Sequence, residues 1–148
     1  MSELIFSIPG VPAAKGRPRM TRAGHVYTPA KTATAENLVS IYADQAMEGA
    51  ELMVGPVAIS ILAKFVVPPS YSAKRRALCL SGDLLPEKKP DLDNIIKLIT
   101  DAMNGIVYED DKQVVGIRAL KVYAAHPETE VTVEIVDNTD HLEKGTIN

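Results

Sequence analysis

The segment from Leu92 to Met103 constrains the fold of this chain most, because its apolar and polar residues separate onto opposite sides of a helix. At about 100° per residue, residues that share an arc face the same way, and an apolar arc must face a core. The apolar arc consists of Leu92, Ile95, Ile96, Ile99, Ala102 and Met103. The opposite arc carries Asp93, Lys97, Asp101 and Asn104. The pattern predicts a helix that covers a core with one face and presents charged side chains on the other.

Carboxylates flank this predicted helix at both ends. Pro90 disfavours helical backbone in the residue before it, so Asp91 and Asp93 lie at the beginning of the helix. The N–H groups of a helix N-terminus also favour phosphate. After the helix, the turn that precedes the next strand contains Asp110 and Asp111. We expect the two pairs to converge on one point, where their oxygens would suit a hard cation such as Mg²⁺.

Each of these acids taken alone has an ordinary structural explanation. An aspartate at a helix start is most often a cap, and an Asp–Lys–Asp ladder is most often a solvated face. However, capping explains only one of Asp91 and Asp93, and nothing structural requires Asp110 beside Asp111. Adjacent like charges repel unless a cation joins them or water screens them. We interpret the set as a metal-dependent site that cuts phosphodiester bonds.

At these residues the chain resembles the RusA-type Holliday junction resolvases, small bacterial and phage endonucleases. The resemblance covers residues 89–97 (KPDLDNIIK), 101–105 (DAMNG) and 110–114 (DDKQV), with Met103 in place of the usual leucine. A weaker similarity to the phage-borne branch of the family extends over residues 9–29. The resemblance implies a Mg²⁺-dependent endodeoxyribonuclease that resolves four-way junctions by paired symmetric nicks in DNA recombination and repair. Mn²⁺ would be a substitute for Mg²⁺.

The resemblance also implies roles for individual residues. It makes Asp91, Asp93 and Asp111 the metal ligands, and Lys97 the essential lysine that completes the catalytic set. Asp110 is a further candidate ligand, and Asp101 matches a family position. Between them, Asp93 and Asp101 are expected to hold Lys97, since each lies one helical turn from it.

Basic residues are clustered although the net charge of the chain is −3. Residues 4–35 contain five basic residues and no acid. Phosphate recognition depends on a local positive face more than on net charge. The candidate DNA-binding residues are Lys15, Arg17, Arg19, Arg22, Lys74, Arg75, Arg76 and Lys89.

The order of patterns predicts a single-domain α/β fold over residues 1–148, with a mixed sheet of about four strands and about three helices packed on it. Strands are expected at residues 4–8, 57–67, 113–124 and 130–136. Helices are expected at 32–50, 72–80, where Ser72 is the cap, and 92–103. Residues 10–31 are expected to form a basic loop, and residues 137–148 a frayed tail.

The apolar runs, the start of the chain, the cysteine and the histidines limit the expected cellular compartment and metal chemistry. No apolar run approaches the length needed to cross a bilayer, and the start of the chain lacks the pattern of a secretory signal. A single cysteine, Cys79, excludes an internal disulfide, and the scattered histidines give no zinc spacing. These features predict a cytoplasmic protein without a membrane partner, and the resemblance implies a bacterial cell and a gene of phage, prophage or chromosomal origin.

Two other functions fit the same residues. One is a metal-dependent nuclease that acts on other branched DNA, and the other is a non-catalytic DNA-binding protein whose acidic cluster holds a structural cation. For a junction resolvase we predict a symmetric homodimer, because two nicks related by a two-fold axis need two acidic clusters and the chain has one.

Overall fold

In three of the four strands of the main sheet buried residues alternate with more exposed ones, and the buried residues point to a single face. The computed structural model describes residues 1–16, 19–27 and 30–137 of the chain. Its main strands are β1 (Glu3–Pro9), β4 (Val57–Val66), β5 (Val114–Ala124) and β6 (Glu128–Ile135). The buried strand residues include Leu4, Phe6, Ile8, Val57, Ile59, Ile61, Val131 and Val133. These residues form the sheet side of the core.

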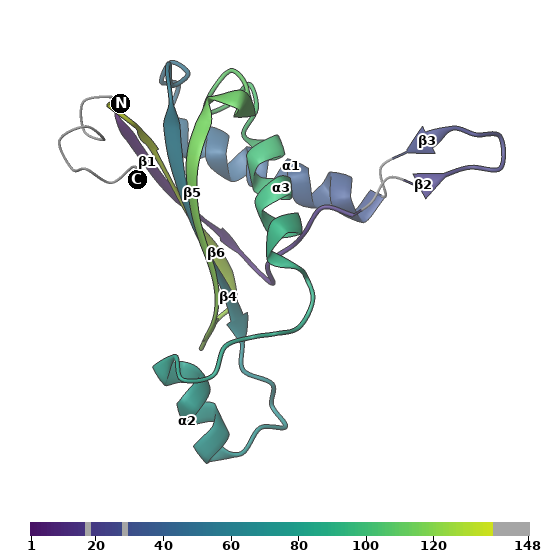
Figure 1. Cartoon of the computed structure of the whole chain (residues 1–148), viewed down its shortest axis with the longest axis vertical. Helices are drawn as coiled ribbons and strands as arrows, with labels where there is room; N and C mark the ends of the chain where they lie inside the picture. The colour runs from purple at the N-terminus through teal and green to yellow at the C-terminus, as the bar shows by residue number, and fades with distance from the viewer. Residues whose placement is uncertain (17–18, 28–29, 138–148) are drawn as a thin grey trace.

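The four strands pair in the order β1-β6-β4-β5 (Figure 1). β6 is antiparallel to both of its neighbours, so that Val133 lies opposite Leu4 on one side and Ile59 on the other. β4 and β5 are parallel. A parallel pair needs a crossover connection, and here that connection contains the helices α2 (Ala73–Ser81) and α3 (Leu92–Ala102).

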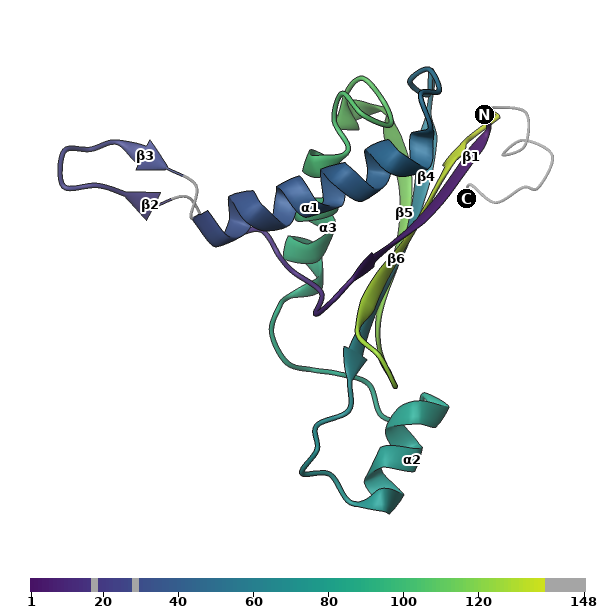
Figure 2. The ribbon, with the colours of Figure 1, turned by 180° about the vertical axis from the view of Figure 1, so that it is seen from behind.

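Two helices cover the same face of this sheet. α1 (Ala30–Met47) and α3 lie on one side of it in both views (Figures 1 and 2). α1 contributes Val39, Ala43 and Met47 to the core, and the hydroxyl of Ser40 donates a hydrogen bond to the carbonyl of Ala102 at 2.8 Å. α2 lies apart from this layer, beyond the C-terminal end of β4 (Figure 1). None of the described helices is long and apolar enough to cross a bilayer.

The structure confirms the predicted single α/β domain with its four-stranded mixed sheet and three helices. Segment 10–31, expected as a loop, contains a small antiparallel hairpin of β2 (Arg19–Met20) and β3 (Val26–Tyr27). Two-residue strands are too short to show alternation, so the pattern gave no sign of them. α1 begins and ends earlier than its predicted limits of 32 and 50. The predicted frayed tail lies outside the described residues from position 138 on.

Candidate active site

Both aspartates at the start of α3 project into solvent. Asp91 is the N-cap residue with extended backbone (φ −67°, ψ 142°), yet its side chain accepts no capping hydrogen bond. The helix starts on the backbone alone, because the N–H groups of Asn94 and Ile95 both donate to the carbonyl of Asp91. Asp93 follows in the first turn, and no described residue donates a hydrogen bond to its carboxylate. Capping therefore accounts for neither carboxylate.

The charged face of α3 lies where the sequence predicts it. Ile95, Leu98, Ile99 and Ala102 are buried, whereas Lys97 is 59% exposed. The Lys97 ammonium donates a hydrogen bond to Asp101 at 3.0 Å. The expected second interaction, from Lys97 to Asp93, is absent among the described residues, so the prediction that both acids hold this lysine is wrong for Asp93. Because the Lys97 ammonium has this single partner, it keeps N–H donors that can bind another acceptor.

Lys15 comes from the basic segment but packs against α3. Its ammonium donates to Asp101 at 2.5 Å and lies 3.1 Å from a carboxylate oxygen of Glu36, and its backbone N–H donates to the carbonyl of Asn94. The hydrogen bond to Asp101 raises the pKa of Lys15. Burial acts to raise the pKa of Asp101, but hydrogen bonds from Lys15 and Lys97 outweigh it and lower that pKa. Lys15, predicted to bind DNA, thus has an ion-pair role inside the protein.

The Asp110–Asp111 pair divides into two different environments. Asp110 is the N-cap of the short 3₁₀ helix η1 (Asp111–Gln113), and its carboxylate accepts a hydrogen bond from the Lys112 N–H at 2.9 Å. No described residue donates a hydrogen bond to the carboxylate of Asp111. Asp110 therefore stabilises the turn, whereas the Asp111 carboxylate has no structural partner among the described residues.

Tyr108 anchors this turn to the end of α3. Its buried hydroxyl donates to the carbonyl of Thr100, in the last turn of the helix, at 2.7 Å. Burial, with the nearby charges of Asp111, Asp101 and Asp110, raises the pKa of Tyr108 well above its ordinary value. Asp111 consequently lies near the C-terminal end of α3.

The two carboxylate pairs do not converge within one chain. α3 has 11 residues and is therefore about 16 Å long, with Asp91 and Asp93 at its beginning and Asp111 beyond its end. Figure 1 shows these two ends, one after the loop from α2 and the other at the turn before β5. Within the described part of the chain, no group of three or more histidine, cysteine, aspartate or glutamate side chains is arranged to hold a metal ion. The expectation of one meeting point is not met in the single chain, because a whole helix lies between the pairs.

Part of the predicted DNA-binding set lies on the β2–β3 hairpin, which projects away from the sheet (Figures 1 and 2). The backbone of Arg19 pairs with that of Tyr27, and Arg22 is exposed in the turn between the strands. That turn is closed by the Thr21 N–H, which donates to the His25 carbonyl at 2.8 Å. Arg17 lies outside the described residues. The hairpin thus carries its basic residues away from the core.

The other predicted set lies on α2 and the loop that follows it. Lys74, Arg75 and Arg76 are exposed, and so is Lys89. The Arg75 guanidinium lies 3.9 Å above the ring of Tyr71, and the Lys88 ammonium lies 5.7 Å from the same ring. Lys88 belongs to the same basic cluster as Lys89 but was not among the candidate DNA-binding residues, and Tyr71 was not predicted at all. The four-residue spacing of Tyr71 and Arg75 is the available signal for their contact.

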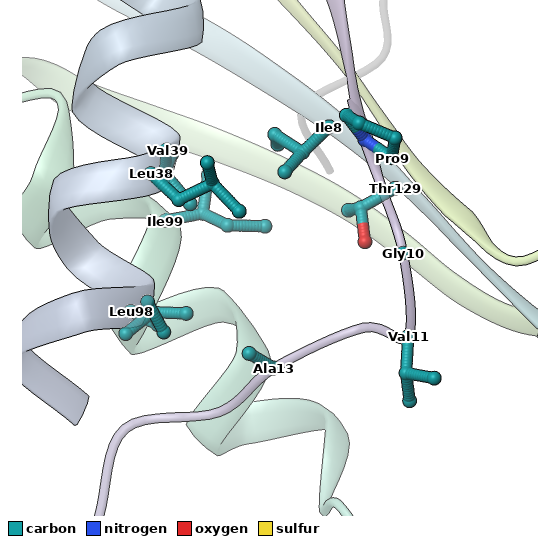
Figure 3. Close-up of a pocket in the computed structure, with 11 residues that line it drawn as sticks. Ile8, Pro9, Gly10, Val11, Ala13, Leu38, Val39, Leu98, Ile99 and Thr129 are labelled. Carbon is teal, nitrogen blue, oxygen red and sulfur yellow. The ribbon is translucent and has the colours of Figure 1, made fainter. Parts of the chain in front are cut away.

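An apolar hollow of about 50 Å³ lies between the end of β1, α1 and α3. Figure 3 shows side chains of Ile8, Leu38 and Ile99 around it, with Thr129 as a polar exception. None of its lining residues is charged. A site for a cation or a phosphate needs charged or strongly polar ligands, so this hollow is separate from the candidate active site.

This α/β domain presents carboxylates and Lys97 on the charged face of α3 and carries basic residues on two projections, a combination that suits the cutting of nucleic acid. Residues 9–134 match the family described as endodeoxyribonuclease RusA, and the chain therefore belongs to this family of nucleases. It is also similar to the uncharacterized protein YqaN of Bacillus subtilis (strain 168). The two are 35% identical over 136 residues, which cover 88% of this chain and 95% of that protein.

Proposed function

We propose that this chain is a metal-dependent, structure-specific endodeoxyribonuclease that resolves Holliday junctions. The observation that carries the proposal is the division among its acids. Asp101 and Asp110 are occupied by hydrogen bonds within the protein, whereas Asp91, Asp93 and Asp111 accept none from the described residues. Carboxylates without structural partners, within the range that matches a nuclease family, are the candidates for the reaction.

The chemistry of the donor set suits a hard divalent cation, although the carboxylates come together only in the dimer proposed below. Asp91, Asp93 and Asp111 would hold Mg²⁺, with Mn²⁺ as a substitute, because each offers carboxylate oxygens that no described residue engages. When bound, such an ion lowers the pKa of a coordinated water and neutralises charge on the phosphate oxygens. Asp110 has one oxygen engaged in capping and is the weaker candidate.

Lys97 would act on the phosphate itself. Its ammonium is exposed and is oriented by Asp101, so it can stabilise negative charge on the reacting phosphate or protonate the leaving oxygen. Lys15 holds Asp101 from the opposite side, since each Asp101 oxygen accepts from a different lysine. Asp101 is therefore a positioning residue that keeps Lys97 in place.

DNA would contact the chain on two surfaces. The hairpin presents Arg22, with Arg17 and Arg19 close in sequence, and α2 presents Lys74, Arg75 and Arg76. The stacking of Arg75 on Tyr71 restricts the guanidinium before DNA arrives, which reduces the entropy lost on binding a phosphate. The two surfaces lie at separate ends of the molecule (Figure 1), as contacts to different arms of a branched DNA require.

We further propose that the working unit is a homodimer. Two copies related by a two-fold axis would supply the paired nicks, and the chain alone leaves its carboxylate pairs at opposite ends of α3. The proposal requires that in the dimer Asp111 of one copy lies near Asp91 and Asp93 of the other. Sedimentation equilibrium should find a dimer at micromolar concentration, and a monomer that still makes paired nicks would disprove this arrangement.

A panel of cutting assays tests the main proposal. The substrates are a synthetic four-way junction, a flap and a linear duplex, each with and without Mg²⁺. Asp91→Asn, Asp93→Asn and Asp111→Asn should each abolish cutting of the junction while DNA binding persists. Asp44→Asn, at an exposed aspartate on α1, is the matched control and should cut like the wild type.

The panel also separates the rival functions. Equal cutting of flap and junction would favour a nuclease for branched DNA in general, and binding without cutting would favour a non-catalytic protein with a structural cation. Cutting by any one of the three Asn variants at the wild-type rate would remove that residue from the ligand set. A cytoplasmic location and a phage or prophage origin stay predictions.

A further inference from the structure

The side chain of Gln113 uses its whole hydrogen-bonding capacity inside the protein. Its amide nitrogen donates to the carbonyls of Met53 and Gly55, at 2.9 and 3.0 Å. Its amide oxygen accepts from the N–H groups of Glu109 and Asp110, at 3.0 and 3.2 Å. A glutamine amide has two N–H donors and an oxygen with two lone pairs, so all four positions are satisfied.

These four bonds connect two segments that are far apart in the sequence. One is the loop at residues 53–55, just before β4, and the other is the turn that carries Asp110 and Asp111. The hydrogen bond from the Asp110 N–H to the Gln113 side chain also completes a capping box for η1. In that capping box the Asp110 carboxylate accepts in return from the backbone of η1. The backbone on the N-terminal side of Asp111 is thus held by the Gln113 amide.

We propose that Gln113 is a positioning residue for Asp111. The Asp111 carboxylate has no hydrogen-bond donor among the described residues, so its placement depends on the backbone of its turn. Gln113, two residues away, holds that backbone because its hydrogen bonds connect the turn to the loop at residues 53–55, just before β4. The inference rests on the proposed function, in which Asp111 is a metal ligand, and adds a residue to which that function assigned no role.

The rest of the fold does not depend on this amide. Val107 and Tyr108 are buried, and they stay anchored by the Met53 N–H bond to the Val107 carbonyl and by the Tyr108 hydroxyl bond to Thr100. Loss of the Gln113 amide would therefore loosen residues 109–111 and leave the domain folded. A defect in the placement of Asp111 can therefore be measured in a variant whose domain is still folded.

The test uses two substitutions and a matched control. Gln113→Met keeps the length of the side chain and removes all four hydrogen bonds. Gln113→Glu retains an acceptor for the Glu109 and Asp110 N–H groups but sets a second carboxylate oxygen against the Met53 and Gly55 carbonyls. Gln45→Met changes the same residue type at an exposed position of α1 and should match the wild type.

Two kinds of measurement apply to each variant. Hydrogen–deuterium exchange of the Glu109 and Asp110 amides should become at least ~10-fold faster in Gln113→Met, because those amides lose their acceptor. The Mn²⁺ dissociation constant, from electron paramagnetic resonance, and the Mg²⁺ half-saturation of junction cutting should both rise ~10–100-fold, as for loss of a residue that orients a metal ligand. Junction affinity in metal-free buffer and the cutting rate at saturating Mg²⁺ should change far less.

The outcomes separate this inference from the function on which it rests. Unchanged amide exchange in Gln113→Met would show that the Gln113 amide does not hold residues 109–111. Faster exchange with unchanged metal affinity would show that holding these residues does not position Asp111. A loss of maximal rate at an unchanged Mg²⁺ half-saturation would overturn it as well. A wild-type chain that neither binds Mn²⁺ nor cuts with Mg²⁺ would refute the proposed function itself, and the positioning of a metal ligand with it.

Discussion

The ion pair of Lys15 with Asp101 joins the start of the basic segment to α3, and its strength can be worked out from the structure. The ammonium lies 2.5 Å from the carboxylate, and the two side chains are 27% and 16% exposed. Exposed pairs contribute about 0.2–1 kcal/mol, and breaking a fully buried pair costs about 3–5 kcal/mol. For this partly buried pair we expect a coupling free energy of about 1–2 kcal/mol, between these limits.

A double-mutant cycle of Lys15→Met and Asp101→Asn, measured by urea unfolding at pH 7, gives this coupling directly. The same cycle for Lys97 and Asp101 is the internal comparison, since that pair has the four-residue spacing of a helix surface and Lys97 is mostly exposed. Its coupling should be only about 0.3–0.5 kcal/mol. A Lys15–Asp101 coupling no larger than the Lys97–Asp101 coupling would refute the reasoning from burial.

The coupling should also depend on pH in a defined direction. The pKa of Asp101 is lowered in the folded state, so its contribution is present above the ordinary value of 3.8 and is lost as the pH falls through the lower folded value. The pKa of Lys15 is raised, so its contribution is present below 10.5 and is lost as the pH rises through the higher folded value. A coupling that disappears between about pH 5 and pH 9 would contradict this assignment.

Three further predictions concern single features of the site. Lys97→Ala should slow junction cutting at least ~10²-fold, the effect of removing one charge-stabilising donor, with unchanged far-UV circular dichroism; a wild-type single-turnover rate would make it an ordinary surface lysine. Replacing Arg17, Arg19 and Arg22 by Ala should flatten the plot of log affinity against log salt by about 0.7–0.9 for each phosphate that the hairpin no longer neutralises, and an identical slope would show that the hairpin does not touch the DNA backbone. Tyr108→Phe should lower the unfolding free energy by about 1–2 kcal/mol, because a buried hydrogen bond is removed; calorimetry that finds no decrease would refute this estimate.

Much of the fold could be predicted from the chain because single elements obey local rules. The period of α3 separated Ile95 and Ile99 from Lys97, and the structure has them buried and exposed in that way. Ser72 was expected as the cap of α2, and its side chain does accept from the Arg75 N–H. Strand order, the hairpin in segment 10–31 and the place of α2 were not predicted, because they depend on interactions between residues far apart in the chain.

The candidate site shows the same difference between what local patterns predict and what contacts between distant residues decide. Residue types and spacing indicated the candidate carboxylates and the basic clusters, because a cation site needs oxygen ligands and phosphate binding needs basic residues. The resemblance to the RusA family added the expected roles of the carboxylates and of Lys97. Only the tertiary structure decided which acids are occupied, because Lys15 reaches Asp101 from 86 positions away. It also separated the two carboxylate pairs by the length of α3 and joined Gln113 to Met53 across 60 positions. Hydrogen bonds between distant segments form only when the chain is packed, and no local pattern records them.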